Sequence, residues 1–170
     1  MPGSTIADLL KASARSAIHL ELRDWYTLDD PDWRTWRAGQ QPDVPVTRAG
    51  WSGMVREITG RGVSVRRLRV VSEPISAYVQ YEYDITQAHN VAAGEDVRWL
   101  PRRTASELFL PPTDFWVVDE VTTFNHFDGD GNWVEEDLRN DDALAKRLTE
   151  VFDTAWALGV PHADYRPVTS

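Results

Sequence analysis

The chain has 170 residues, a net charge of −9 at pH 7 and no cysteine. At about 100–200 residues per domain, this length predicts a single domain over residues 1–170. The absence of cysteine excludes disulfides and thiolate chemistry, and no apolar run reaches the roughly 18 residues of a membrane span. We therefore expect a cytoplasmic protein without a membrane partner. Its acidic charge disfavours direct contact with nucleic acid.

Hydrophobic periodicity, capping residues and turn residues predict the order of elements along the chain. We expect a helix after Thr5, a half-buried strand at 18–22, a helix at 31–38, a surface loop at 40–46, a helix at 51–59, a buried strand at 63–71, a helix from Pro74 to about His89, a strand at 96–100, short strands at 115–118, 121–127 and 133–138, and a final helix from Asp141 or Asp142 to Gly159. Residues 1–4 and 162–170 are expected to be loose termini.

The middle of the chain predicts a strand–helix–strand unit. The strand at 63–71 is rich in β-branched residues, and Ser72 is placed to cap a helix with Pro74 in its first turn. One face of that helix carries Ile75, Tyr78, Val79, Glu82 and Ile85. Because a second strand follows within about forty residues, the two strands are expected to be parallel, joined by the helix as a crossover. The chain then continues as an antiparallel meander, so the fold class is α/β with a mixed sheet.

Polar residues at the carboxyl ends of the two parallel strands form a candidate ligand site. Ligands of open α/β sheets bind beyond these ends, and a helix start beside arginines suits an anion. The candidate ligand-binding residues are Arg69, Ser72, Glu73, Tyr78, Arg98 and Arg102. The alternative is structural, with Glu73 paired to an arginine and Ser72 acting only as a cap.

The sequence predicts neither a metal site nor a cofactor. The four histidines have no metal-ligand spacing, and no glycine-rich loop follows Val71 to hold nucleotide phosphates. The stretch DGDGN at 128–132 resembles the start of a calcium loop, but Trp133 and Arg139 replace the required glycine and glutamate. A hairpin turn is the favoured interpretation of this stretch.

Several segments together resemble an uncharacterised family of actinobacterial, streptomycete-type proteins. The likeness extends from about Ser16 to Trp156 and rests on residues 67–74 (RLRVVSEP), Asn90, 93–98 (AGEDVR), 100–102 (LPR), 114–119 (DFWVVD) and the later Phe127, Asp128 and Gly131. Such proteins often accompany helix-turn-helix regulators, so the resemblance implies a regulatory or accessory role. The resemblance implies no particular enzymatic activity.

The order of elements also resembles one lobe of the phospholipase D-like fold. In active members of that fold, a His-x-Lys-x4-Asp motif lies on the strand before the hairpin, and its histidine is the nucleophile. When Asp119 is aligned with the closing aspartate, no histidine or lysine lies between Pro111 and Val118. The resemblance therefore implies the scaffold without the catalytic residues of its active members.

Three functions follow from these observations. The leading hypothesis is a non-catalytic regulatory domain that binds a small ligand, with an anion as one candidate, or a protein partner. The first alternative is a small-molecule enzyme of secondary metabolism with Glu73 or Asp119 as general base, because proton abstraction needs only one carboxylate of raised pKa. The second is an interaction module that presents an apolar surface to a DNA-binding regulator.

Overall fold

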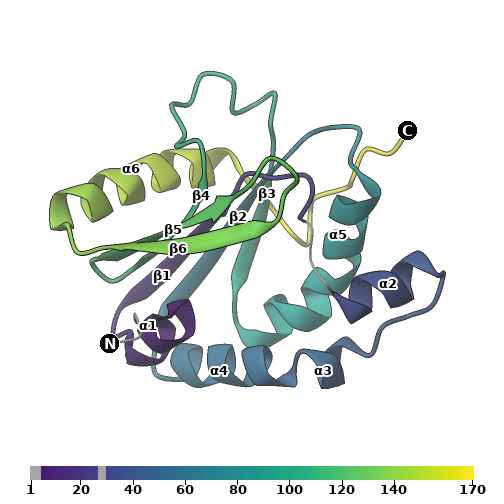
Figure 1. Ribbon diagram of the computed structural model, residues 1–170, viewed down its shortest axis with the longest axis horizontal. Helices are drawn as coiled ribbons and strands as arrows, with labels where there is room; N and C mark the ends of the chain where they lie inside the picture. The colour runs from purple at the N-terminus through teal and green to yellow at the C-terminus, as the bar shows by residue number, and fades with distance from the viewer. Residues whose placement is uncertain (1–4, 27–29) are drawn as a thin grey trace.

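The computed structural model describes residues 5–26 and 30–170, which share one mixed sheet (Figure 1). Within these residues the sheet has seven strands in the order β6-β5-β4-β1-β2-β3-β7. Their bounds are β1 Ser16–Glu21, β2 Ser64–Val71, β3 Asp96–Pro101, β4 Asp114–Val118, β5 Val121–Phe127, β6 Trp133–Arg139 and β7 Val160–Pro161. Strands β1, β2 and β3 are parallel, whereas β4, β5 and β6 form an antiparallel meander beside β1. The predicted fold class is confirmed.

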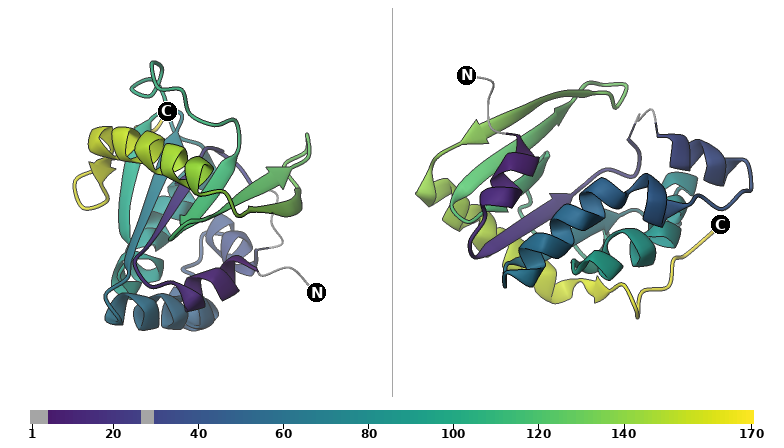
Figure 2. Two further views of the ribbon diagram at one scale, coloured as in Figure 1. Left: turned by 90° about the vertical axis from the view of Figure 1, so that its left-hand side faces the viewer. Right: turned by 90° about the horizontal axis from the view of Figure 1, so that it is seen from below.

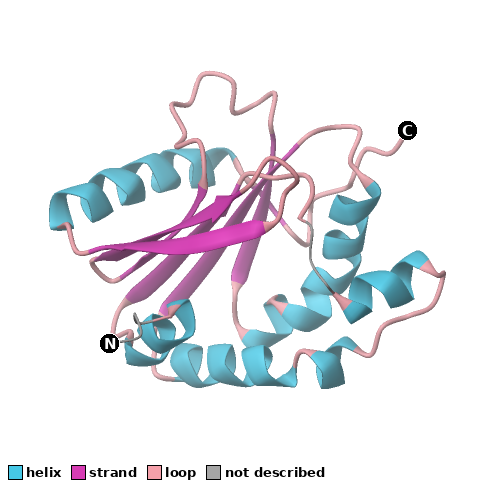
Figure 3. Ribbon diagram, in the orientation of Figure 1, coloured by secondary structure: helices cyan, strands magenta, loops and turns pink. Residues whose placement is uncertain are grey.

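Helices cover both faces of the sheet (Figure 2, Figure 3). They are α1 Ile6–Ala12, α2 Pro31–Arg37, α3 Val44–Thr47, α4 Ala49–Gly60, α5 Ala77–His89, the 3-10 turn Val91–Ala93 and α6 Asp142–Leu158. Helix α6 packs alone against one face, where Phe152 and Trp156 meet Leu20 and Leu68. Helices α1, α4 and α5 cover the other face. This second layer decides the character of the candidate site.

Local capping signals are confirmed where the side chain that makes the cap is adjacent in sequence. Thr5 and Asp8 form the expected capping box of α1, and the Asp30 side chain accepts from the Asp32 amide at the start of α2. Asp141 caps α6 in the same way. These contacts satisfy free N–H groups of the first helical turn, which is why the residues predict the helix starts.

Helix α5 begins later than predicted. Its cap is Ser76, whose hydroxyl accepts from the Val79 amide, so the helix does not start at Ser72 and Pro74. The Ser72 hydroxyl instead donates to Asp24, at 2.6 Å. The chain from 40 to 46 also differs from the predicted loop, since α3 begins at Val44, which is buried.

Strand β1 is buried on both faces, which corrects the prediction of a half-buried strand. Ile18 and Leu20 point into the core beneath α6, as expected. His19 and Glu21, on the alternate face, are also buried, with 8% and 9% of their surfaces exposed. The polar alternation suggested solvent on this side, but α4 and α5 cover it, and Glu21 is paired with Arg67 and Arg69 inside.

The C-terminal segment is packed rather than loose. Strand β7 pairs with β3, and Tyr165 is buried with its ring stacked on Trp99 at a centroid distance of 5.4 Å. The Val168 carbonyl accepts from the Ile75 amide. The prediction of loose ends was therefore wrong for 162–170, because aromatic packing ties this stretch to the sheet. Residues 1–4 lie outside the described residues. Among the helices of the described chain, none has the length and apolar character to cross a membrane.

Replacing Tyr165 with alanine is expected to lower the free energy of unfolding by about 2–4 kcal/mol, because it removes a buried ring and its stacking on Trp99. Urea unfolding followed by circular dichroism measures the change. Thr169→Ala, at an exposed position of the same segment, is the control and is expected to stay within about 0.5 kcal/mol of wild type. If the two variants changed the free energy of unfolding equally, the prediction of a loose terminus at 162–170 would stand.

Candidate functional site

A network of buried ion pairs lies between the sheet and helices α4 and α5. We use the name buried ion network for Glu21, Arg67, Arg69 and Glu95. Arg67 donates to both Glu21 and Glu95, and its Nε lies 2.7 Å from Glu95 Oε2. Arg69 donates to Glu21 at 2.6 Å and to the Thr86 hydroxyl at 2.6 Å. All four side chains are buried, so each charge depends on its partners.

The guanidinium groups keep the central carboxylates ionised. Burial alone would raise the pKa of Glu21, but the charges of Arg69 and Arg67 outweigh burial and hold that pKa well below its usual range. Arg67 does the same for Glu95, which also accepts from Trp51 at 3.1 Å and Asn90 at 3.0 Å. The network is therefore charged and hydrogen-bonded at neutral pH.

A cavity of about 460 Å³ opens beside this network. We call it the polar cavity. It lies at the carboxyl end of β1, where Glu21 is the last residue of the strand and Asp114 is the first residue of the neighbouring β4. Its walls come from α1, α4, α5 and strands β1, β4, β5 and β6. The lining residues are Ile6, His19, Glu21, Tyr26, Trp51, Tyr78, Glu82, Asp114, Asn125, Phe127 and Trp133.

Two carboxyl groups of the polar cavity lack a close cationic partner. Asp114 accepts from the Tyr26 hydroxyl and from the Leu22 amide, at 2.8 Å for the amide. Glu82 lies 3.7 Å from Arg69 Nη2, too far for a hydrogen bond. Burial raises the pKa of Asp114 to about 6 and that of Glu82 to about 7, above the ordinary range of carboxyl groups. Both groups thus titrate near neutral pH.

Two further polar side chains line the cavity, and one of them holds a buried atom without a hydrogen bond. Tyr78 is only 4% exposed and faces the cavity with its ring and hydroxyl. His19 stacks on Trp116 at 4.0 Å, and its Nδ1 is buried without a hydrogen-bond partner. Burial lowers the pKa of His19 to about 3, so the ring is neutral. Buried polar groups are almost always paired, which makes this cavity unusual.

The predicted meeting of the Ser72 and Arg102 corners is present. Strands β2 and β3 pair in register up to Val71 and Pro101, and Arg102 Nε donates to the Ser72 hydroxyl at 3.1 Å. The guanidinium also donates to the carbonyls of Leu22 and Val70 and contacts Asp24 at 3.3 Å. An adjoining hollow of about 620 Å³ is lined by Leu22, Arg23, Val70, Arg102, Ala105, Ser106, Leu110, Pro111 and Pro112. An anion at this corner would meet the Asp24 carboxylate as well.

The other predicted ligand-binding residues are divided among different places. Tyr78 lines the polar cavity, and Arg69 lies directly behind it in the buried ion network. Glu73 accepts from the Tyr165 hydroxyl at 2.8 Å. Arg98 lies on the face covered by α6, where its guanidinium sits 4.4 Å from the ring centroid of Trp156. The six residues therefore do not surround one volume.

The carboxylates proposed as general bases have structural partners. Asp119 accepts from the backbone amides of Ala14, Arg15 and Ser16 at 2.9–3.0 Å. Burial would raise its pKa, but these amides outweigh burial and lower it, so Asp119 is a poor base. Neither Glu73 nor Asp119 lines the polar cavity. Within the polar cavity, burial raises the pKa of the carboxyl groups of Glu82 and Asp114, which the sequence analysis did not single out as site residues.

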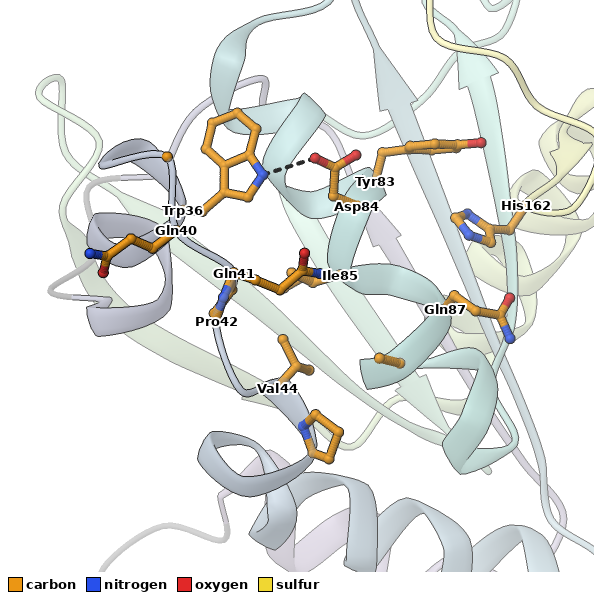
Figure 4. Close-up of a pocket in the computed structure, with 13 residues that line it drawn as sticks. Trp36, Gln40, Gln41, Pro42, Val44, Tyr83, Asp84, Ile85, Gln87 and His162 are labelled. Carbon is orange, nitrogen blue, oxygen red and sulfur yellow. Dashed lines mark hydrogen bonds between the residues drawn. The ribbon is translucent and has the colours of Figure 1, made fainter.

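An open groove of about 930 Å³ lies on the outer side of α5 (Figure 4). Trp36 donates to Asp84 at 2.8 Å across it. Its other walls are the chain from Gly39 to Pro45, with Tyr83, Ile85, Gln87, Ala88 and His162. Asp84 and Gln87 are exposed, so solvent already satisfies them. Size alone makes this groove a candidate, whereas the polar cavity adds a buried polar atom without a hydrogen-bond partner.

The parallel unit, the meander and the final helix together define an α/β domain with a phospholipase D-like fold. The chain belongs to a family of domains of unknown function (DUF6879), whose model matches residues 4–167. No curated protein matches the chain.

Solved structures agree on the fold. The archaeal chromatin protein TrmBL2, described as showing a novel mode of DNA binding, is 11% identical with a TM-score of 0.53, covering 91% of this chain and 48% of its own. This chain thus spans about half the length of TrmBL2. The phospholipase D family member Nuc from Salmonella typhimurium is 14% identical with a TM-score of 0.51, covering 94% of this chain and 88% of Nuc. At these identities the likeness describes the fold alone.

Proposed function

We propose that this protein is a non-catalytic domain with a regulatory or accessory role, and that it binds a small organic molecule in the polar cavity. The observation that carries the proposal is the Nδ1 atom of His19, which is buried and has no hydrogen-bond partner in the described chain, in a side chain that lines the cavity. Leaving such a group unpaired costs about 1–3 kcal/mol. A ligand with a hydrogen-bonding group would remove that cost. The cavity also lies beyond the end of a parallel strand, the usual place for ligands in open α/β sheets.

The sequence at the catalytic positions of the fold supports a non-catalytic role. When Asp119 is aligned with the closing aspartate of the His-x-Lys-x4-Asp motif, Pro112 stands at the position of the histidine and Asp114 at that of the lysine. Proline has no nucleophilic side chain. Asp119 itself is held by three backbone amides. The fold would therefore keep a cavity at this site without the residues that catalyse the reaction in active members.

The distribution of arginines favours a small ligand over direct nucleic-acid binding. Arg67 and Arg69 are buried in ion pairs, and Arg102 is held by Asp24 and two carbonyls. Phosphate contacts need cations that are free at the surface, and the net charge is −9. DNA binding by a structural neighbour therefore does not extend readily to this chain.

A protein partner is a second candidate function. Phe109, on the loop between β3 and β4, is 96% exposed. It borders a shallow hollow of about 270 Å³ with Leu108 and Val151. Exposed large apolar side chains that gather on a surface are typical of interaction sites, so this loop is where a partner protein would dock.

Binding in the polar cavity is tested by thermal shift against a metabolite collection. We expect at least one compound to raise the melting temperature of the wild type, and Tyr78→Phe to weaken that compound about tenfold, the effect of one lost hydrogen bond. Tyr83→Phe is the matched control on the same helix, since Tyr83 borders the open groove instead. The proposal fails if no compound acts, or if every active compound responds to Tyr83→Phe and not to Tyr78→Phe.

The absence of catalysis is tested with bis(4-nitrophenyl) phosphate, a general phosphodiester substrate. We expect hydrolysis by the purified protein to equal the rate of buffer alone, because Pro112 stands at the nucleophile position. Asp114→Asn serves as the comparison. Hydrolysis by the wild type that this substitution abolishes would contradict the non-catalytic assignment.

A further inference from the structure

The polar cavity and its surroundings hold an excess of negative charge. Four buried or largely buried carboxyl groups, Glu21, Glu82, Glu95 and Asp114, face two guanidinium groups, those of Arg67 and Arg69. Glu21 bonds to both arginines and Glu95 bonds to Arg67, so the hydrogen-bonding capacity of these cations is largely used. The remaining two carboxyl groups, Glu82 and Asp114, line the cavity together with Glu21.

Among the described residues, no cationic side chain donates a hydrogen bond to Asp114 or Glu82. Asp114 forms no ion pair within 5–26 and 30–170, and its partners are a phenol and a backbone amide. Arg69 forms an ion pair with Glu82 at 3.7 Å, too long for a hydrogen bond. The charge of Arg23 acts on Asp114, and its guanidinium lies 5.0 Å from the centroid of the Phe127 ring at the cavity wall. The cavity therefore offers carboxyl oxygens to an incoming positive group.

Aromatic rings form much of the remaining wall. Tyr26, Tyr78, Trp51, Phe127 and Trp133 all line the cavity. Ring faces carry partial negative charge and attract cations, most strongly where water is excluded. The Nδ1 atom of His19, whose side chain is only 10% exposed, adds an independent polar atom without a hydrogen-bond partner at the cavity wall. A hydrated metal ion such as Mg²⁺ or Ca²⁺ binds through six or more oxygen ligands, and aromatic rings supply none of these.

We infer that the polar cavity binds an organic ammonium ion, whose N–H groups donate to Glu82 and Asp114 while its apolar body lies against the aromatic wall. This inference rests on the proposed function and adds the chemical class of the ligand. It differs from the anion expected at the Arg102 corner, because the two places carry opposite charge. A protonated amine brings a further positive charge and supplies the hydrogen-bond donors that these carboxyl groups lack from cationic side chains.

Matched probes separate charge from shape. Butyl, cyclohexylmethyl and phenylethyl frames are each offered as the amine, the alcohol and the carboxylate, and binding is followed by calorimetry and by tryptophan fluorescence, since Trp51 and Trp133 line the cavity. On at least one frame, we expect the amine to bind about tenfold more tightly than either counterpart. In Glu82→Gln/Asp114→Asn this preference is expected to disappear.

Asp84→Asn is the matched control, because Asp84 lies on the same helix but borders the open groove. It is expected to leave amine binding unchanged. Circular dichroism and the melting temperature verify that each variant is folded. The inference is overturned if no amine binds at millimolar concentration, if alcohols or carboxylates bind as tightly on every frame, or if Asp84→Asn removes the binding.

The failures of the two proposals are distinguishable. If carboxylate probes bind and lose affinity in Tyr78→Phe, the inference of an ammonium ligand is overturned, whereas the proposal that the polar cavity binds a ligand is supported. A metabolite screen with no response dependent on Tyr78 would overturn both.

Discussion

Arg67→Leu is expected to lower the free energy of unfolding by about 3–5 kcal/mol. The substitution leaves Glu95 buried without its cationic partner and leaves Glu21 with Arg69 alone, since Arg67 bonds to both carboxylates. Burying an uncompensated charge costs far more than an ion pair contributes. Chemical unfolding in urea, followed by circular dichroism at pH 7, gives the difference from wild type. The melting temperature should fall in parallel.

Arg15→Leu is the control for this experiment. Arg15 pairs with Glu120 at 2.8 Å, but both side chains are 63% exposed, so the pair contributes little to stability. We expect a change within about 0.5 kcal/mol. If Arg67→Leu were as mild as Arg15→Leu, the charges of the buried ion network would not depend on one another as the structure indicates.

Glu82→Gln is expected to become more stable than wild type as pH rises from 5 to 8, by roughly 2–3 kcal/mol at the upper end. Burial raises the pKa of Glu82 to about 7 in the native state, against 4.5 ordinarily. Between these values the native protein holds a proton that the unfolded chain has released, so wild-type stability falls with increasing pH. Glutamine is neutral throughout and removes this dependence. The two proteins should be equally stable below about pH 4.5.

The quantity to measure is the difference in free energy of unfolding between Glu82→Gln and wild type, because other titratable groups change the stability of both proteins with pH in the opposite direction. Burial lowers the pKa of His19 to about 3 and of His89 to about 4. The unfolded chain takes up protons at these rings below about pH 6.5 while the native state does not, so their contribution to stability rises with pH. Urea titrations at pH 5, 6, 7 and 8 provide the values, with the exposed Glu57→Gln as control. A difference that stays constant with pH would show that Glu82 is solvated and that the cavity is open.

Much of the fold follows from short stretches of sequence. Thr5 with Asp8, Asp30 with Pro31, and Asp141 each satisfy amides of their own first helical turn, so their effect needs no distant partner. The parallel pairing of β2 and β3 follows from a strand–helix–strand order that permits few topologies. The exception, Ser72, shows the limit: its hydroxyl binds Asp24, a residue 48 positions away, and the helix start moves to Ser76.

The candidate site depended on contacts between distant segments. The sequence contained one usable signal, Glu82 among the apolar residues of its helix face, because a carboxylate on a buried face requires a reason. A second signal is the repetition of charged residues two apart on adjacent strands, with His19 and Glu21 on β1 and Arg67 and Arg69 on β2. Each pattern alone predicts a strand face that is exposed to solvent. Only the parallel register places the charges opposite one another.

The sequence by itself determined most helices and strands and the mixed α/β class, because hydrophobic period, caps and turns act within a few residues; α3 and β7 were not predicted. It also shows that no histidine or lysine lies between Pro111 and Val118. The tertiary structure decided which polar residues are buried, since α4 and α5 close over one face of the sheet and turn Glu21, Arg67 and Arg69 from surface charges into an internal network. The ionisation of Glu82 and Asp114 was decided there too, because a pKa depends on desolvation and neighbouring charge, which exist only once distant segments have packed together.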